Sequence, residues 1–503
     1  MKSSIQWIKR NRFEAIIIIL IIVVASFLRF YKLSDYMTFL GDEGRDALIV
    51  KDILVEHIIP SIGPPSSVGN VYLGPLYYYM MATSMAIFWL NPVAAAGMVA
   101  LIGVMAVALI YYLARVWFGM YSAILSASLY ALSFVVTFYS RSSWNPNPAP
   151  FFTLLAVLGF YKARQTKNFL WLILTGLSTA AAVQMHYLAL ILIPVFGILY
   201  IFELFQQKKL QEYNYFISGA FLGVVSFILV MLPLILFDFR HDFLNYRGVV
   251  ALFTKSGSSV SFNLFDSLAK ISPIFDQKLV GRYLGAENPL IIFLVSIFII
   301  TPIMIALYKV VYKKEAMSWS IKALSVWLAV GLFGVSLFRL EVYDHYLGFL
   351  SPVPFLLLGA FIFELPDKWK KIAAALIIII LGFLNLQQNV LFKPAGNQFT
   401  RTREIAQFVL NEAGNKPFNF ALISKNNYDS AYQFYFYIYG HEPKVVPIDV
   451  TDQLLVVCED PICKPVGNAK YEIAGFGWTL MDKETYFDGV RIYRLIHNSA
   501  QPK

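Results

Sequence analysis

Cysteine and histidine are both scarce in this sequence. The 503 residues include two cysteines, Cys458 and Cys463, and six scattered histidines, none of which stands at a metal-ligand spacing from another. A zinc or iron–sulfur framework built on thiolates is therefore excluded, and we expect neither a protein-borne catalytic metal nor a cofactor. A location outside the cytoplasm would allow the two cysteines to form a disulfide, and two unpaired thiols are the alternative. The sequence leaves both alternatives open.

Charged residues are also few. They make up 14% of the chain, whereas hydrophobic residues make up 58%, aromatic residues 16%, and the mean hydropathy is +0.62. Soluble globular proteins contain about 25% charged residues, so this composition indicates a polytopic membrane protein. The net charge is +10, but lysine and arginine stand in short clusters between apolar runs. This pattern orients helices in a bilayer and argues against a nucleic-acid partner.

Apolar runs long enough to cross a bilayer, roughly 17 to 25 residues, recur along the chain. Lys2, Lys9, Arg10 and Arg12 precede the first run, and no small-x-small cleavage site is present, so we expect an uncleaved anchor whose basic end lies in the cytoplasm. We predict eleven spans, at residues 13–30, 92–114, 120–139, 149–161, 169–185, 188–205, 216–237, 289–311, 318–338, 347–363 and 372–391.

Residues 72–90 are apolar but are not counted as a span. If this segment crossed, Arg115 and the later basic clusters would all lie outside, whereas without it they all lie inside with the N-terminus, as the positive-inside rule requires. We therefore expect an interfacial helix, rich in tyrosine, within a first outer loop of about residues 31–91. The later basic clusters are Lys162/Arg164/Lys167, Lys208/Lys209, Lys309/Lys313/Lys314 and Lys368/Lys370/Lys371.

The chain changes character after the last apolar run. Residues 402–413 and 428–439 have helical patterns, and residues 419–424, 454–458 and 490–496 have the pattern of short strands. We predict an α-helical polytopic membrane domain at residues 1–394 and a small extracytoplasmic α/β domain at residues 395–503. An odd number of spans with the N-terminus inside places the second domain outside the cell.

The most informative stretch is Gly-Asp-Glu-Gly-Arg-Asp at residues 41–46, which follows the first span. Charges that meet hydrocarbon cost roughly 3 kcal/mol each, so such a stretch marks either a solvated loop or a working site. Two glycines that free the backbone, Arg45 beside the acidic pair, and Lys51 five residues further on favour a working site. We interpret Asp42 and Glu43 as a catalytic pair.

Further polar and aromatic clusters fall on the same predicted face. Each has a structural alternative, since an arginine at a helix end often lies along it with its charge in water, a histidine at a membrane boundary is often part of the packing, and tyrosine and tryptophan often form an interfacial belt. The functional interpretation is a site that binds a phosphate or a sugar. The candidate binding residues are Arg45, Lys51, Arg141, Asn145, His186, Tyr187, Arg240, His241, His345 and Tyr346.

The order of these features resembles the C-type membrane glycosyltransferases, in particular the group of protein O-mannosyltransferases and aminoarabinose transferases. The shared features are the acidic pair after the first span, Pro-Leu-Tyr-Tyr-Tyr at residues 75–79, Tyr-Ser-Arg at residues 139–141, and His-Tyr at residues 345–346. The resemblance covers about residues 13–390. Each motif is short, so the resemblance depends on their order and on the topology.

The resemblance implies an inverting glycosyltransferase of the cell envelope. It implies that Asp42 is the base for the acceptor with Glu43 as its neighbour, that Arg141 lies near the donor phosphate, and that the donor is a hexose or pentose on a polyprenyl phosphate. The acceptor is a hydroxyl of a lipid, glycan or protein, and membrane lipids surround the protein. The chain departs from the mannosyltransferases after Arg141, where Trp-Asn-Pro-Asn replaces an acidic residue, and it lacks their large inserted outer domain. These differences weaken the case for a protein acceptor.

The residue types fit this chemistry. A lipid-linked phosphate gains charge as it leaves, and fixed Arg, Lys and His donors stabilise it, while a carboxylate that removes the acceptor proton contributes about 10²- to 10⁴-fold. One base and an in-line displacement predict inversion at the anomeric carbon. We expect a multi-pass plasma membrane protein whose active site is extracytoplasmic. The alternatives are a transporter or flippase for lipid-linked sugars, which predicts charges near the bilayer midplane, and a sensor or scaffold, which leaves the acidic pair unexplained.

Overall fold

The computed structural model describes residues 10–66, 71–209, 212–254, 260, 263–285, 287–414 and 416–498. The predicted basic residues Lys2 and Lys9, and the side chains of Lys208 and Lys209, lie outside these residues. The chain forms two compact units, which we call unit 1 and unit 2. Unit 1 comprises Met1–Tyr31, Pro60–Met80 and Ala96–Pro394, and unit 2 comprises Lys32–Ile59, Met81–Ala95 and Ala395–Lys503.

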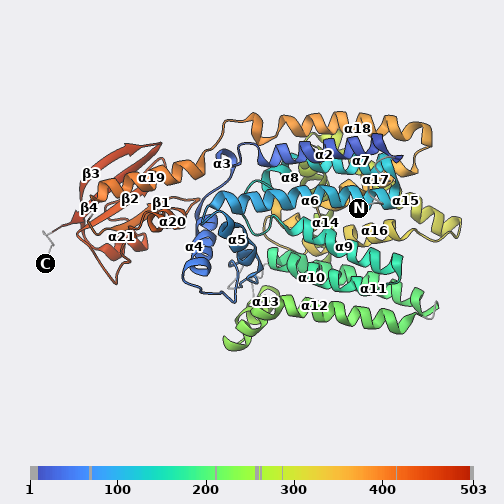
Figure 1. The fold of residues 1–503 in the computed structure, drawn as a ribbon, viewed down its shortest axis with the longest axis horizontal. Coiled ribbons are helices and arrows are strands. Elements are labelled where there is room, and N and C mark those ends of the chain that lie inside the picture. Colours follow the sequence, from blue (N-terminus) through green and yellow to red (C-terminus); the bar gives the residue numbers. More distant parts are fainter. Residues whose placement is uncertain are drawn as a thin grey trace. The chain divides into compact units, whose positions relative to one another are not determined.

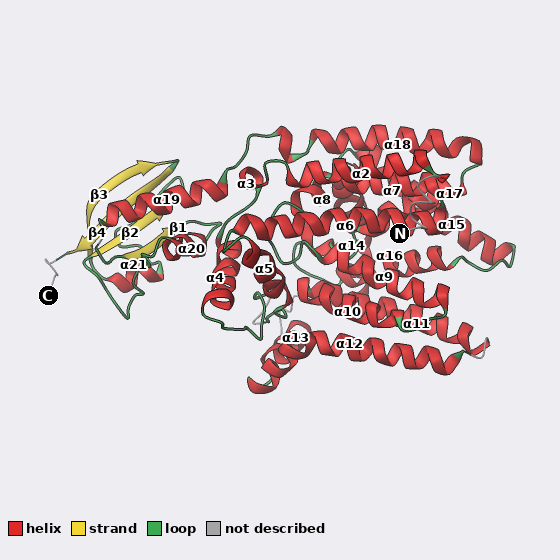
Figure 2. Cartoon of the chain, viewed as in Figure 1, coloured by secondary structure: helices red, strands yellow, loops and turns green. Residues whose placement is uncertain are grey.

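Unit 1 is helical (Figures 1 and 2). Its helices pack around a continuous apolar core that includes Trp327, Phe349 and Phe355, all fully buried. The helix α5 (Leu76–Ile87) begins in unit 1 and continues into unit 2. The other elements are α2 (Arg12–Phe30), α6 (Pro92–Phe118), α7 (Met120–Leu132), α8 (Phe134–Tyr139), α9 (Ala149–Thr166), α10 (Trp171–Met185), η1 (Tyr187–Ile191), α11 (Leu192–Lys209), α12 (Tyr213–Arg240), α13 (Leu244–Thr254), α14 (Leu264–Pro273), η2 (Ile274–Gly285), α15 (Pro289–Tyr312), α16 (Trp319–Ser336), η3 (Asp344–Leu347), α17 (Pro352–Glu364), α18 (Asp367–Gln387) and η4 (Val390–Phe392).

Seven helical segments among the described residues are long and apolar enough to cross a membrane. They are Arg12–Phe30, Pro92–Phe118, Tyr187–Gln207, Tyr213–Arg240, Pro289–Tyr312, Trp319–Ser336 and Asp367–Gln387. Each coincides with a predicted span. The other four predicted spans coincide with α7 and α8, α9, α10 and α17, which are shorter, interrupted or less apolar. The protein is therefore a multi-pass membrane protein, but the count of eleven spans is not confirmed.

The predicted third span is broken at Ser133. This residue has an extended ψ of 123° between α7 and α8, its hydroxyl donates to the Tyr283 carbonyl at 2.8 Å, and the Phe134 amide donates to Asn385 Oδ1 at 3.2 Å. The Ser133 hydroxyl therefore has its partner on η2 and the Phe134 amide has its partner on α18, and both elements lie far away in the sequence. A hydropathy pattern does not show such a break because it counts only apolar residues.

The interfacial segment forms a helix too short to span. The 12 residues of α5 extend for about 18 Å, against a hydrocarbon thickness of roughly 30 Å. Its first turn is held by Gln184, whose Oε1 accepts from the Leu76 amide at 2.9 Å. This length agrees with the expectation that residues 72–90 do not cross the membrane.

Ion pairs gather the basic helix ends at one end of unit 1. Arg115, at the end of α6, bonds to Glu14 in the first turn of α2. Arg164 of α9 pairs with Glu203 of α11 at 3.1 Å. The rings of Trp117, Tyr161 and Trp319 meet at 5.6 to 5.9 Å and join the ends of α6 and α9 to the start of α16. The N-terminal end of α2 and the basic ends of α6 and α9 therefore lie on one side of the bundle, as the positive-inside argument predicts.

Unit 2 contains a four-stranded sheet in the order β1-β2-β4-β3 (Figure 2). The strands are β1 (Asn419–Ile423), β2 (Gln453–Cys458), β3 (Thr479–Phe487) and β4 (Val490–His497), and β1 pairs with β2 in parallel while the other pairs are antiparallel. Its helices are α3 (Leu33–Tyr36), α4 (Gly41–Val55), α19 (Gln398–Ala413), α20 (Ser430–Ile438) and α21 (Tyr471–Phe476). The predicted α/β character of the C-terminal segment is confirmed, and its extracytoplasmic position stays a prediction.

The strand β3 was not predicted from the sequence. This edge strand is largely exposed on both faces and carries Asp482, Lys483 and Glu484, so it lacks the apolar alternation on which strand prediction depends. The available signal was the Asp488-Gly489 pair that follows it, because both residues have positive φ, 43° and 79°, as a two-residue hairpin turn requires.

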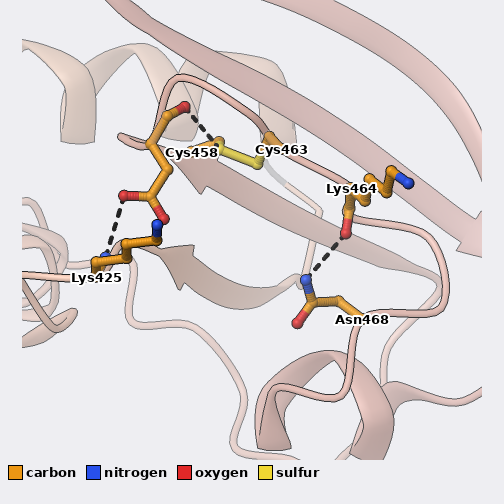
Figure 3. The surroundings of a disulfide bond; sticks show 6 residues. Lys425, Cys458, Cys463, Lys464 and Asn468 are labelled. Carbon is orange, nitrogen blue, oxygen red and sulfur yellow. Dashed lines mark hydrogen bonds between the residues drawn. A yellow bond between two sulfur atoms is a disulfide. The ribbon is translucent and has the colours of Figure 1, made fainter.

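Cys458 and Cys463 form a disulfide (Figure 3). Cys458 ends β2, and Cys463 stands five positions later. The loop between them is held by further bonds, such as the one from the Lys425 amide to Asp460 Oδ1 at 3.1 Å. Of the two alternatives that the sequence left open, the structure therefore has the disulfide and not two free thiols. Disulfides persist in oxidising compartments.

Candidate catalytic site

The acidic stretch forms the first turn of α4 in unit 2. Glu43 accepts hydrogen bonds from the Leu40 amide at 3.0 Å and from the Thr38 hydroxyl at 2.5 Å. A glutamate three residues into a helix that bonds back to the preceding amide satisfies an otherwise unpaired donor there. Glu43 is also buried, and burial raises the pKa of its carboxyl. Its geometry gives Glu43 the function of a helix cap, and its predicted part in catalysis stays a prediction.

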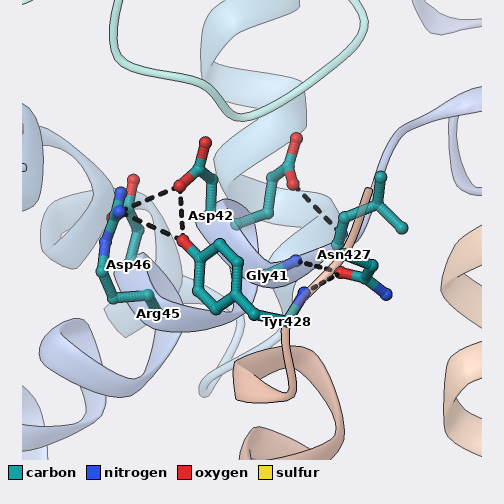
Figure 4. Close-up of polar contacts among 8 residues, drawn as sticks. Gly41, Asp42, Arg45, Asp46, Asn427 and Tyr428 are labelled. Atoms are coloured by element: carbon teal, nitrogen blue, oxygen red, sulfur yellow. Dashed lines mark hydrogen bonds and ion pairs between the residues drawn. The ribbon is translucent and has the colours of Figure 1, made fainter. Parts of the chain in front are cut away.

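Asp42 is held through one carboxylate oxygen (Figure 4). Its Oδ1 accepts from Arg45 Nη1 at 2.9 Å and from the hydroxyl of Tyr428. No described residue donates a hydrogen bond to Oδ2, and the side chain is 42% exposed. Asp42 therefore combines a fixed orientation with an accessible basic oxygen, which is what a general base needs.

Arg45 joins Asp42 to a second carboxylate that the sequence analysis overlooked. Its Nε and Nη2 donate to Asp46 Oδ1 at 2.9 and 2.7 Å. Asp46 is completely buried, and its Oδ2 has no hydrogen-bond partner within the described part of the chain. Burial raises the pKa of Asp46 to about 7, although Arg45 acts against the rise. The signal was in the sequence, because Asp46 follows Asp42 by one helical turn and lies on the same face.

The two glycines of the stretch serve close packing. A Cβ at Gly41 would lie 2.4 Å from the Tyr428 ring, and a Cβ at Gly44 would lie 2.2 Å from the Ala431 amide. Neither glycine has a positive φ. The two glycines are therefore explained by close packing and not by the predicted freedom of the backbone. Any side chain at these positions would force α4 away from α20.

Lys51 lies near the other end of α4. Its ammonium group pairs with Asp52 at 2.7 Å and lies 4.4 Å from the centre of the Tyr437 ring. The predicted phosphate-binding function of Lys51 stays a prediction.

Several of the predicted residues come together in unit 1. The ring of His345 lies 4.4 Å from Trp144 and 5.9 Å from His186, and Tyr346 lies 4.9 Å from His186. Asn145 donates to the Met185 carbonyl at 2.8 Å and so fixes the residue before His186. Burial lowers the pKa of His345 to about 4, so its imidazole is neutral at pH 7. A neutral imidazole forms hydrogen bonds but carries no charge, and the predicted phosphate-binding function of His345 stays a prediction.

Arg141 is buried against the end of α2. Its side chain is 1% exposed, and its guanidinium donates to the Leu28 carbonyl at 2.7 Å and to the Tyr31 carbonyl at 2.6 Å. These carbonyls lie at the C-terminal end of α2, where no following helical amide is available to donate to them. These contacts favour the structural alternative for Arg141, in which its side chain caps the end of a helix, over the binding of a phosphate. The donor-phosphate function remains an untested prediction.

Arg240, His241 and Tyr187 lie in a different part of unit 1. Tyr187 donates to the Tyr72 carbonyl, and the Tyr72 ring packs edge-on against Phe237 at 6.3 Å. Phe237 in turn stacks on His241 at 4.0 Å, next to the exposed Arg240 at the end of α12. Tyr187 directly follows His186 in the chain, so the backbone connects this group to the histidine cluster.

The sequence analysis missed the ion pair that holds His345 in place. Arg282 of η2 donates to Asp344 Oδ2 from Nε at 3.0 Å and from Nη2 at 2.8 Å, and the Tyr283 hydroxyl donates to the Asp344 carbonyl at 2.9 Å. Arg282 stands in a π-helical segment without an apolar run, which is why no local pattern marked it.

Comparison with known proteins agrees with the resemblance seen in the sequence. A sequence model of the dolichyl-phosphate-mannose-protein mannosyltransferase family matches residues 73–236. No curated protein sequence matches the chain.

Solved structures share the fold. ArnT from Cupriavidus metallidurans, solved with bound undecaprenyl phosphate, is similar over 96% of this chain and 99% of its own, with a TM-score of 0.58 and 13% identity. The Archaeoglobus fulgidus oligosaccharyltransferase in its apo form is similar over 88% of this chain and 65% of its own, with a TM-score of 0.54 and 13% identity. The same organism's AglB, in complex with an inhibitory peptide and a dolichol-phosphate, gives a TM-score of 0.51 at 12% identity over 88% of this chain and 65% of its own.

Proposed function

We propose that this chain, which has the fold of these membrane glycosyltransferases, transfers a sugar from a polyprenyl phosphate to an acceptor hydroxyl with Asp42 as the base. The observation that carries the proposal is the geometry of Asp42. One oxygen of its carboxylate is held by Arg45 and Tyr428, and the other is open for a proton. ArnT and AglB were solved with undecaprenyl phosphate and dolichol-phosphate respectively, which supports a lipid-linked donor.

The proposed reaction is a single in-line displacement. The acceptor hydroxyl passes its proton to Asp42 Oδ2 as its oxygen bonds to the anomeric carbon of the sugar. The bond from that carbon to the phosphate oxygen breaks, and its electron pair leaves with the polyprenyl phosphate. Because the attacking and leaving oxygens lie on opposite sides of the carbon, the product has the inverted anomeric configuration. A positioned base contributes about 10²- to 10⁴-fold to such a step.

The transferred sugar is a hexose or a pentose, and the acceptor is a hydroxyl of a lipid, glycan or protein. Cationic or hydrogen-bonding side chains stabilise the charge that develops on the leaving phosphate. Beside Asp42 in unit 2, the candidates for this function are Arg45 and Lys51 of α4. The phosphate-binding functions of Arg240, His241 and His345 in unit 1 stay predictions.

The reaction takes place on the extracytoplasmic side. Two observations support this placement. The basic ends of α6 and α9 gather with the start of α2, and the positive-inside rule assigns that end to the cytoplasm. Unit 2, which carries Asp42, also carries the disulfide between Cys458 and Cys463, and such bonds are typical of oxidising compartments.

The proposal is tested by the variant Asp42→Asn, which keeps the shape of the side chain and removes the base. Purified protein in detergent is incubated with polyprenyl-phosphate sugars, and the released lipid phosphate is measured. We expect Asp42→Asn to lose at least 10²-fold in rate. The matched control is Asp452→Asn, an exposed carboxylate of unit 2, which should retain wild-type rate.

Two outcomes contradict the proposal. Wild-type rate in Asp42→Asn would exclude this residue as the base. If the wild-type protein moves the lipid-linked sugar across a vesicle membrane and releases no lipid phosphate, the protein is a transporter or flippase.

A further inference from the structure

The C-terminal part of unit 2 supplies a hydroxyl to the proposed base. We propose that Tyr428 is a positioning residue for the transfer reaction, which fixes Asp42 through Oδ1 so that Oδ2 faces the acceptor. This inference depends on the proposed function, and it assigns a task to residues 395–503. No local pattern indicates this contact, because Tyr428 lies 386 positions after Asp42.

The first support is the packing of α4 on α20. The two helices run in the same direction, with Gly41 against Tyr428, Gly44 against Ala431 and Lys51 against Tyr437. The absence of a Cβ at positions 41 and 44 is what permits this approach. Residues 41–46 therefore form part of the same folded unit as the C-terminal sheet.

An aromatic anchor precedes α4. Phe39 is 1% exposed, and its ring meets Phe399 of α19 edge-on at 5.6 Å, Phe434 at 5.9 Å and Tyr435 at 5.7 Å. Edge-to-face aromatic pairs contribute about 0.5 to 1.5 kcal/mol each beyond their burial. Phe39 thus fixes the chain three residues before Asp42 to the C-terminal helices.

A hydrogen-bonded network then fixes Tyr428 itself. Asn427 Oδ1 accepts from the Gly41 amide at 2.8 Å and from the Tyr428 amide at 2.9 Å, so it joins the start of α4 to the backbone of Tyr428 (Figure 4). Asn427 Nδ2 donates to both oxygens of Glu459, at 3.1 and 3.2 Å, and the Tyr432 hydroxyl donates to Glu459 at 2.7 Å. Glu459 directly follows β2, which connects the network to the sheet.

The Tyr428 hydroxyl bonds to Asp42 within a cluster of charged groups. Asp42 faces Arg45, Asp46 and Glu43 on α4 and Tyr428 before α20. Burial, and then the hydrogen bond to Asp42, raise the pKa of the Tyr428 phenol, so it remains a donor at neutral pH. Removing the hydroxyl leaves Arg45 Nη1 as the one described donor to Asp42 Oδ1, so the carboxylate is held less firmly.

The first experiment is Tyr428→Phe, assayed for lipid-phosphate release over a range of donor and acceptor concentrations. We expect kcat to fall about 10-fold while KM changes little, because the base is less well placed and the substrates still bind. The matched control is Tyr439→Phe, a half-buried tyrosine at the end of α20 that should keep the wild-type kcat and KM. A wild-type kcat in Tyr428→Phe would overturn the proposal. So would a loss of activity that only follows a loss of folded protein, because that result describes a purely structural residue.

The second experiment measures the packing without any assay of transfer. Gly44→Ala places a methyl group 2.2 Å from the Ala431 amide, so α4 must move away from α20. We expect faster amide hydrogen exchange at residues 41–46, together with the kinetic pattern of Tyr428→Phe. The control is Gly97→Ala on α6, where a Cβ has open space.

These two readouts separate the possible failures. If the wild-type protein releases no lipid phosphate, the proposed function fails whatever the exchange data show. If it does release lipid phosphate and Gly44→Ala changes neither hydrogen exchange nor rate, the positioning proposal fails alone.

Discussion

Arg115 Nη2 donates to Glu14 Oε2 at 3.1 Å, and this pair joins the end of α6 to the start of α2. The Tyr111 hydroxyl donates to the same glutamate, one turn earlier on α6. Glu14 is 2% exposed, and a buried carboxylate needs such partners. The contact means that α6 returns to the end of the bundle where α2 began, so α2 and α6 together cross and come back. The short α5 between them therefore adds no crossing.

The first prediction concerns this topology. Single cysteines are placed at Lys314, beyond α15, and at Lys416 in unit 2, in a Cys458→Ser/Cys463→Ser background so that no native thiol is present. We expect an impermeant maleimide added to intact cells to label position 416 and not position 314. Cells broken open before labelling serve as the control and should show both sites modified. Labelling of position 314 in intact cells would reverse the orientation and place the proposed site in the cytoplasm.

The apolar pattern located the helices of unit 1 better than it located their ends. Long uniform runs such as α2, α12 and α15 matched their predictions because hydropathy is a local property. The break at Ser133 depends on partners in η2 and α18, and the ion pair of Arg282 with Asp344 joins residues 62 positions apart. No local pattern contains such information.

The candidate site shows the same limit. Asp42, Arg45 and Asp46 occupy one turn of a helix, so their neighbourhood was present in the sequence, although the importance of Asp46 was not seen. Tyr428 and Asn427 reach them only through the fold of unit 2. Arg141 is the opposite case. The sequence offered a phosphate-binding guanidinium or a side chain lying along a helix end, and the hydrogen bonds of Arg141 to the Leu28 and Tyr31 carbonyls favour the second.

The second prediction concerns the pH dependence of stability. Burial raises the pKa of Asp46 to about 7 in the folded protein, above the value near 4 of an exposed aspartate. A carboxyl with a raised pKa stabilises the fold while it is protonated, so its contribution is complete below about pH 4 and is lost as the pH rises to about 7. In Asp46→Asn this loss is absent. We expect the melting temperature of the variant, relative to wild type, to rise between pH 5 and pH 7 and to level off above pH 7.

The measurement is thermal unfolding in detergent at a series of pH values. The control is Asp452→Asn, whose exposed side chain should give a curve parallel to that of the wild type. If the Asp46→Asn curve is also parallel to the wild-type curve, Asp46 does not titrate in this range. The charge of Arg45 would then be balanced by an ionised Asp46 throughout.

The third prediction distinguishes the two interpretations of Arg141. Its guanidinium donates to two carbonyls in the last turn of α2, and each buried carbonyl left without a donor costs about 1 to 3 kcal/mol. We therefore expect Arg141→Ala to lower the melting temperature strongly while the folded fraction binds a polyprenyl-phosphate donor with wild-type affinity. The melting temperature of Arg141→Lys should fall between those of the wild type and Arg141→Ala, because one ammonium group replaces a planar guanidinium that reaches both carbonyls. Donor titration monitored by intrinsic fluorescence, on protein purified by size exclusion, measures the affinity. A tenfold loss of donor affinity at an unchanged melting temperature would instead make Arg141 a phosphate ligand, since a side chain that only closes a helix end has no means of weakening donor binding without weakening the fold.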